Sequence, residues 1–273
     1  MRLRSRYLIF ALLSLVAIAI TAEAGDISNG ASAISANRDS SDDIKGKTSE
    51  LNPYKPTYII LQAGTPDPRS KNIIFTKFQI NIKLPVAEPL FFAYTLKTLW
   101  DITEDSAPFK DYSHNPEFFL DIDNSNVLKI GQIGVEHESN GKSGEDSRSW
   151  NRVYWEPRFV YNRPAGKILG FDTVAVHLKG WYKIEGDQSG NPDILDYYGN
   201  GELAIKLYSE RDYWAVKARK GLKKAYGNIQ VEFIHRISES LGIYAQFWDG
   251  YGESLLDYNK GTTRYGIGFA LTK

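Results

Sequence analysis

Apolar and polar residues alternate with a period of two along most of the chain. In the segment NIIFTKFQINIKL, Ile80, Ile82 and Leu84 share one side of an extended chain, and Gln79 and Asn81 share the other. Successive side chains of a β-strand point to opposite faces, so this period predicts strands with one apolar and one polar face.

The same alternation returns in FDTVAVHLKGWY, GELAIKL and YGNIQVEFIH, and clusters rich in Gly, Asp, Asn and Pro separate such segments. Beyond the N-terminal part, no apolar run approaches the roughly 20 residues of a membrane-spanning helix. We predict about twelve strands, over residues 57–64, 72–85, 89–100, 115–123, 127–139, 149–162, 171–183, 199–210, 212–220, 224–236, 241–251 and 262–272.

Two architectures fit alternating strands: a soluble sandwich, whose apolar faces form a core, and a transmembrane barrel, whose apolar faces meet lipid. The predicted strands are close to the roughly 9–11 residues that a tilted membrane strand needs. Their polar sides carry charges such as Lys206 and Glu232, which suit a barrel interior that holds paired charges and water. Aromatic residues near strand ends are typical of interfacial girdles, and here they are Tyr58, Trp100, Tyr161, Trp181, Tyr182 and Tyr251. We therefore predict an all-β fold, a transmembrane antiparallel β-barrel of about twelve strands.

The N-terminus has the pattern of a targeting segment. MRLRSRYLIFALLSLVAIAITAEAG begins with basic residues, continues with an apolar run over residues 8–20 and ends in the small-x-small triplet AEA. These are the parts of a cleaved secretory signal peptide. We predict a signal peptide over residues 1–24, a flexible tail over 25–50, where Asn, Ser, Asp and Gly predominate, and the barrel over 51–273. A barrel behind a cleaved signal belongs in the bacterial outer membrane.

The composition excludes several classes of protein. The 273 residues carry 33 basic and 33 acidic side chains, so the chain lacks the positive charge that a nucleic-acid partner normally requires, and we expect no such partner. It has no cysteine, which excludes disulfides, thiolate metal sites and a cysteine nucleophile.

One polar stretch between two predicted strands, HESNGKSGEDSRSWN over residues 137–151, carries candidate chemistry. His137 and Ser139 continue the apolar side of the strand before it, and Asn151 lies on the apolar side of the strand after it. If the hairpin closes with Ser139 opposite Ser149, Asn151 lies directly opposite His137.

These residue types fit nucleophilic hydrolysis. A serine hydroxyl is activated when a neutral histidine takes its proton, and the histidine needs a third group to fix its tautomer. An asparagine carbonyl can do this at a hydrocarbon boundary, where an ionised aspartate would be costly. The alternative is that His137, Ser139 and Asn151 are rim residues that bind headgroups or turns.

Four stretches carry a family resemblance. HESNGKSGEDSRSWNR resembles the signature of the bacterial outer-membrane phospholipase A family, and FWDGYGESLLDYNKGTTRYGIGF resembles that family's last hairpin. LNPYKPTYIILQ and DSAPFKDYSHNPEFFL are similar to its N-terminal strand and an early extracellular loop. The resemblance implies a twelve-stranded barrel that hydrolyses acyl esters of phospholipids, of the A1/A2 and lysophospholipase type, requires calcium and is activated as a homodimer in the outer membrane.

The resemblance also implies roles for individual residues. Ser139 is the expected nucleophile, His137 the base and Asn151 the group that orients it, with the backbone amides of Ser139 and Gly141 in the oxyanion hole. The implied calcium ligands are the Ser147 hydroxyl, the Lys142 carbonyl and, across the dimer, the Ser106 carbonyl, with waters completing the shell. We interpret residues 253–258 as a turn rather than an acidic metal site.

Two positions depart from the family pattern. Leu96 stands where a polar glutamine is expected in the dimer face, and the chain ends in LTK, with Phe269 as the nearest aromatic residue to the terminus. Two alternatives to an outer-membrane phospholipase are a non-catalytic transport or structural barrel and a soluble periplasmic esterase.

Overall fold

The computed structural model of this chain describes residues 54–67, 70–123, 127–162, 170–184, 190–223 and 226–272. The predicted signal peptide and the predicted flexible tail lie outside the described residues.

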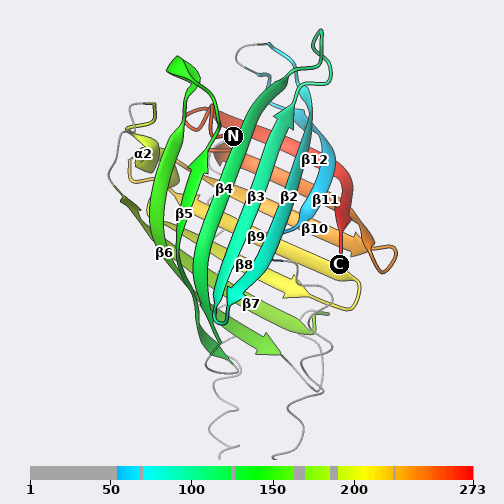
Figure 1. The fold of residues 1–273 in the computed structure, drawn as a ribbon. Helices are drawn as coiled ribbons and strands as arrows, with labels where there is room; N and C mark the ends of the chain where they lie inside the picture. The colour runs from blue at the N-terminus through cyan, green and yellow to red at the C-terminus, as the bar shows by residue number, and fades with distance from the viewer. Residues whose placement is uncertain are drawn as a thin grey trace, which may run out of the picture. The chain divides into compact units, whose positions relative to one another are not determined.

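Within the described residues, twelve antiparallel strands close into one barrel (Figure 1). Each strand pairs with its neighbours in sequence, and β1 pairs with β12. The strands are β1 (Thr57–Gly64), β2 (Ile74–Ala87), β3 (Leu90–Trp100), β4 (Phe109–Ile122), β5 (Leu128–Ser139), β6 (Ser149–Asn162), β7 (Thr173–Ile184), β8 (Gly201–Tyr208), β9 (Asp212–Lys220), β10 (Gly227–Arg236), β11 (Leu241–Tyr251) and β12 (Gly261–Leu271). The predicted antiparallel barrel is confirmed.

The two faces of the strands are sorted as a membrane barrel requires. Ile82 is 50% exposed on the outside, as are Val135 and other large apolar side chains, whereas Lys77 and Glu117 are buried inside. An apolar exterior around a charged interior is the reverse of a soluble sandwich and matches a lipid-facing barrel. No helix among the described residues is long and apolar enough to cross a membrane.

The predicted aromatic girdle is only partly correct. Tyr161 and Tyr182 face outward and are 41% and 66% exposed. Tyr58 and Trp181 instead point into the barrel, where Tyr58 stacks on Tyr244 with ring centroids 4.5 Å apart. Alternate residues of a strand share one face, and Tyr58 and Trp181 each share a face with polar side chains that point into the barrel.

Strand β4 begins at Phe109, six residues before its predicted start at 115. The stretch that the resemblance placed in an extracellular loop is therefore largely strand. Asp111 and Ser113 point inward and are buried. The start of β4 therefore lacks the clear alternation of apolar and polar residues from which the strands were predicted.

A glycine bulge sets the parity of β5. The pairing of β5 with β6 shifts between Lys129 and Gln132, so that one extra residue lies in β5. Gly131 has φ +78°, and a Cβ built there would lie 2.0 Å from the Glu156 carbonyl oxygen, so only glycine fits. Outward positions are even-numbered before the bulge and odd-numbered after it, as Ile130 and Ile133 show.

The β11–β12 connection folds against the barrel interior. Glu253 is buried between Lys77 Nζ at 3.3 Å and Arg264 Nε at 2.9 Å, and Leu255 is fully buried. Leu255 shares a hydrophobic cluster with the inward-facing Trp150 and with residues of the short helix α2 (Ile194–Tyr198). Residues 253–258 thus form a structural turn, and a charged cavity of about 340 Å³ lies deeper inside.

Candidate active site

The predicted triad residues lie at one end of the barrel, where β5 and β6 are joined by residues 140–148. His137 pairs with Asn151 and Ser139 pairs with Ser149, so the predicted register is confirmed. Because successive strands run in opposite directions, the connections after odd-numbered strands share this end, including the β3–β4 connection that holds Ser106.

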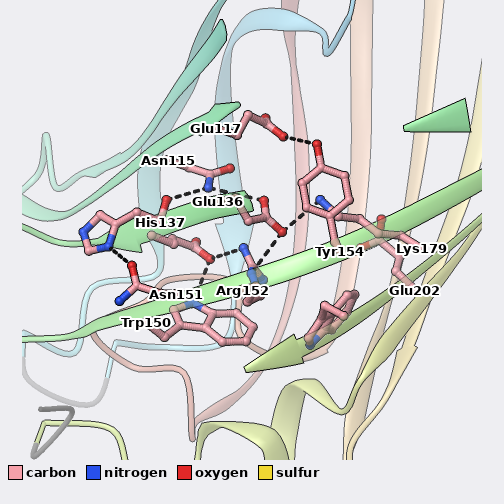
Figure 2. Close-up of polar contacts among 12 residues, drawn as sticks. Asn115, Glu117, Glu136, His137, Trp150, Asn151, Arg152, Tyr154, Lys179 and Glu202 are labelled. Carbon is pink, nitrogen blue, oxygen red and sulfur yellow. Dashed lines mark hydrogen bonds and ion pairs between the residues drawn. The ribbon is translucent and has the colours of Figure 1, made fainter. Parts of the chain in front are cut away.

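His137 and Asn151 are joined side chain to side chain. The Nδ1 atom of His137 lies 2.8 Å from Oδ1 of Asn151 (Figure 2). An amide oxygen only accepts, so Nδ1 carries the proton and Nε2 keeps the lone pair that a general base needs. In this conformation, and among the described residues, no hydrogen bond joins His137 to the Ser139 hydroxyl. Such bonds commonly tighten only when substrate binds.

The surface around this pair is apolar. His137 and Ser139 are half-buried, Asn151 is exposed, and Val135 and Val153 continue the same outward face toward the middle of the strands. A substrate with long acyl chains can therefore lie against these strands while its ester reaches the polar residues at the rim.

Alternate residues of the same strands form a buried ion network behind the site. Arg152 Nε lies 3.0 Å from Glu136 and its Nη2 lies 3.2 Å from Glu138. Lys179 also binds Glu136 at 2.9 Å (Figure 2). The Trp150 indole donates to Glu138 at 3.0 Å. This network ties β5 to β6 directly beneath His137 and Asn151.

Replacing Arg152 with Met is expected to lower the free energy of unfolding by about 3–5 kcal/mol, because Glu138 would remain buried without its cation. Urea unfolding in detergent micelles, followed by tryptophan fluorescence, measures this. Lys223→Met is the matched control, since Lys223 pairs with Asp196 at 2.8 Å but is 71% exposed, and we expect no measurable change there. Equal stability of Arg152→Met and Lys223→Met would contradict the structural role of the network.

Sequence reasoning missed Asn115. In the β4–β5 register, Pro116 lies opposite His137, and proline has no N–H to donate to the His137 carbonyl. The Asn115 side chain supplies that donor, with Nδ2 2.7 Å from the carbonyl oxygen. The sequence feature that could have indicated this role is the Asn-Pro pair at 115–116. It can be interpreted only once the pairing of β4 with β5 is known.

Asn140 organises the connection between β5 and β6. Its side chain is 1% exposed, donates to the Asp146 carbonyl at 2.8 Å and accepts from the backbone N–H of Arg148 at 2.9 Å and of Lys142 at 3.3 Å. One buried amide therefore fixes both halves of this loop. Sequence reasoning assigned Asn140 no role.

Gly141 fits the role predicted for an oxyanion donor. Its φ of +63° is a conformation that favours glycine, and its N–H has no acceptor among the described residues. This free donor lies two residues beyond Ser139, the predicted nucleophile, and is available to an oxyanion there.

The predicted calcium ligands are only partly brought together. Lys142 and Ser147 share the loop that Asn140 fixes, and the Ser147 hydroxyl has no partner among the described residues. Ser106 lies exposed in the β3–β4 connection, and no hydrogen bond among the described residues links it to that loop. The described residues hold no cluster of three or more His, Asp or Glu that could bind a metal ion, so a cation here would depend on carbonyl, hydroxyl and water oxygens. Such hard oxygen donors fit calcium.

The connection that carries Ser106 is anchored at its base by Asp101. This carboxylate accepts from Ser70 at 3.0 Å, from Asn72 at 3.0 Å and from the Thr103 hydroxyl at 3.0 Å. Burial alone would raise the pKa of Asp101, but these hydrogen bonds outweigh it and hold the pKa below its ordinary value. The loop is therefore held by a charge that persists in mild acid.

Comparison with known proteins gives one consistent family. The model of the phospholipase A1 family matches residues 34–271. A phospholipase A1 of Salmonella typhimurium is 31% identical over 209 residues, which span 71% of this chain and 68% of that protein. The phospholipase A1 of Escherichia coli strain K12 matches with the same identity and coverage.

Solved structures give the same result. The outer membrane phospholipase dimer of Salmonella typhi with bound calcium superposes with a TM-score of 0.70 and 27% identity, covering 82% of this chain and 93% of that one. The outer membrane phospholipase A of Escherichia coli gives a TM-score of 0.71 at 27% identity, covering 81% of this chain and 98% of that one.

Proposed function

Because this chain belongs to the phospholipase A1 family, we propose that it is a calcium-dependent phospholipase that cleaves acyl esters through Ser139, His137 and Asn151. It is a phospholipid ester hydrolase of the bacterial outer membrane. We further propose that it cleaves the ester at both acyl positions and also hydrolyses lysophospholipids. The observation that carries the proposal is the 2.8 Å hydrogen bond between His137 and Asn151, on the outward face and two residues from Ser139.

In the acylation step, His137 Nε2 takes the proton of the Ser139 hydroxyl as that oxygen attacks the ester carbonyl. The Asn151 carbonyl keeps the imidazole in the tautomer that can accept this proton. The backbone N–H groups of Ser139 and Gly141 would donate to the oxyanion. The protonated His137 then gives its proton to the leaving alkoxide, and the lysophospholipid departs.

In the deacylation step, His137 takes a proton from water, and the water oxygen attacks the acyl-serine carbonyl. The second tetrahedral intermediate collapses, the proton returns to Ser139, and the fatty acid is released. The apolar outward face beside Val135 and Val153 would hold the acyl chain throughout.

Calcium, held by the Ser147 hydroxyl and the Lys142 carbonyl of one copy and the Ser106 carbonyl of a second, would supply positive charge that favours the oxyanion. The requirement for Ser106 from a second copy makes the homodimer the proposed active state. Leu96 faces outward on β3 between Ile80 and His114, so it can pack against a second copy but cannot hydrogen-bond to it.

The test is fatty-acid release from a phospholipid in mixed micelles with calcium, using the refolded full-length barrel. A phospholipid with different acyl chains at its two positions shows which ester is cleaved. We expect release by the folded protein and none after heat unfolding. A folded barrel that releases no fatty acid at any calcium concentration would refute the proposed function.

The alternative, a non-catalytic transport or structural barrel, predicts conductance in planar bilayers without fatty-acid release. The buried Leu255 and Leu256 of the β11–β12 connection argue against an open pore.

A further inference from the structure

A second histidine stands beside the proposed nucleophile, on the side away from β6. His114 of β4 pairs directly with Ser139 of β5. It is half-buried and lies on the outward face, because the neighbouring Ser113 points inward. Ser139 is therefore flanked by Ser149 on one side and by an imidazole on the other.

The His114 ring is held in one orientation. Its Nδ1 lies 2.6 Å from the Tyr94 hydroxyl on β3. The ring also stacks on Tyr112, with an interplanar angle of 18° and centroids 6.1 Å apart. When the Tyr94 hydroxyl donates to Nδ1, the single proton of the neutral imidazole resides on Nε2. That N–H has no acceptor among the described residues.

The free Nε2 lies over Gly141. A Cβ built on Gly141 would be 3.6 Å from Nε2 and 3.7 Å from Cδ2 of His114, and among the described residues outside 140–142 no other heavy atom lies within 4 Å of it. The space between the ring edge and the loop is thus open because residue 141 has no side chain. The His114 ring edge and the Gly141 backbone lie beside this space, and among the described residues neither the His114 Nε2–H nor the Gly141 N–H has an acceptor.

Resting on the proposed function, we propose that His114 is a further catalytic residue whose Nε2–H donates to the oxyanion of the ester beside the Gly141 amide. Tyr94 is its positioning residue, because a hydroxyl that donates to Nδ1 leaves the proton of the neutral ring on Nε2, the nitrogen beside Gly141. The histidine acts as a neutral donor and exchanges no proton with the substrate, so His137 remains the base.

Two substitutions separate this role from a structural one. His114→Phe keeps an aromatic ring against Tyr112 but removes the donor, and we expect kcat to fall by about 10–100-fold with KM within about twofold. His114→Gln restores a donor and should recover most of the loss. Tyr94→Phe keeps its ring and loses only the hydroxyl, and we expect a fall of about 3–10-fold in kcat, since part of the ring population then carries the wrong tautomer.

Each variant is assayed on phosphatidylcholine in mixed micelles and on a neutral nitrophenyl ester of a long-chain fatty acid. An oxyanion contact lowers kcat to the same degree on both substrates. A loss confined to the phospholipid, or one that appears only in KM, would overturn the proposal in favour of a headgroup contact. Unchanged kcat in both His114→Phe and Tyr94→Phe would overturn it outright.

The heat-dependent gel mobility of a folded barrel verifies that each variant is folded. If His114→Phe does not fold, Tyr94→Phe decides the question by the same criteria. An inactive wild type would refute the proposed function itself, whereas an active wild type with unaffected variants would refute only the role of His114.

Discussion

Replacement of Ser139 by Ala is expected to lower kcat for phospholipid hydrolysis by about 10⁴–10⁶-fold, while the barrel stays folded. The substitution removes the oxygen that would form the acyl-enzyme, and the loss of a triad nucleophile leaves only the contribution of binding and the oxyanion hole. Ser139 points outward and is half-buried, so the lost hydroxyl has little effect on packing. Fatty-acid release in mixed micelles measures the change.

The matched control is Ser149→Ala. Ser149 lies directly opposite Ser139 in the same hairpin, so the two substitutions remove the same group from adjacent positions. We expect Ser149→Ala to keep nearly full activity. Retention of activity in Ser139→Ala, or equal loss in both variants, would remove Ser139 from the nucleophile's role.

Removal of calcium with a chelator is expected to reduce activity to background, and calcium, but not sodium, should restore it. Because no cluster of carboxylates supports the site among the described residues, the net ligand charge is low, and we expect half-activation at about 10⁻⁴–10⁻³ M calcium. Activity measured across a calcium titration tests this. Full activity in excess chelator would disprove the calcium requirement.

Two serines of the same loop allow the ligand to be tested. Ser147→Ala removes a proposed ligand, and we expect about a tenfold higher calcium concentration for half-activation. Ser143→Ala removes an exposed hydroxyl that makes no capping bond to the short helix after it, so its titration should match the wild type. Superimposable titrations for the two variants would exclude Ser147 as a ligand.

The pairing of His137 with Asn151 could be predicted from sequence because side chains in a strand alternate with a fixed period. A shift of the strand by one residue would have turned its apolar side chains into the barrel. Only the assignment that places His137 and Asn151 on the outward face also keeps the neighbouring Val135 and Val153 outward. The barrel followed from the same reasoning, since charged residues such as Glu232 shared the opposite face.

Other features depend on contacts across strands, which a single sequence does not reveal. The start of β4 escaped prediction because Asp111 and Ser113 are buried among polar partners, as the 2.7 Å bond between Ser113 and Glu138 shows. Asn115 acquires its role only because Pro116 lies opposite His137. His114 drew no attention for the same reason, since its neighbour Ser139 is 25 positions away in the chain.

Because the bulge at Gly131 sets which residues face outward, the number of residues between Gly131 and Ser139 matters more to this segment than their identities. Deletion of one residue there would turn His137 and Ser139 into the barrel and expose Glu136 and Glu138 to hydrocarbon. Between Gly131 and Ser139, only insertions or deletions of an even number of residues therefore keep the same side chains on the outward face. Among homologous enzymes, we expect the spacing from the bulge glycine to the serine at position 139 to differ only by even numbers.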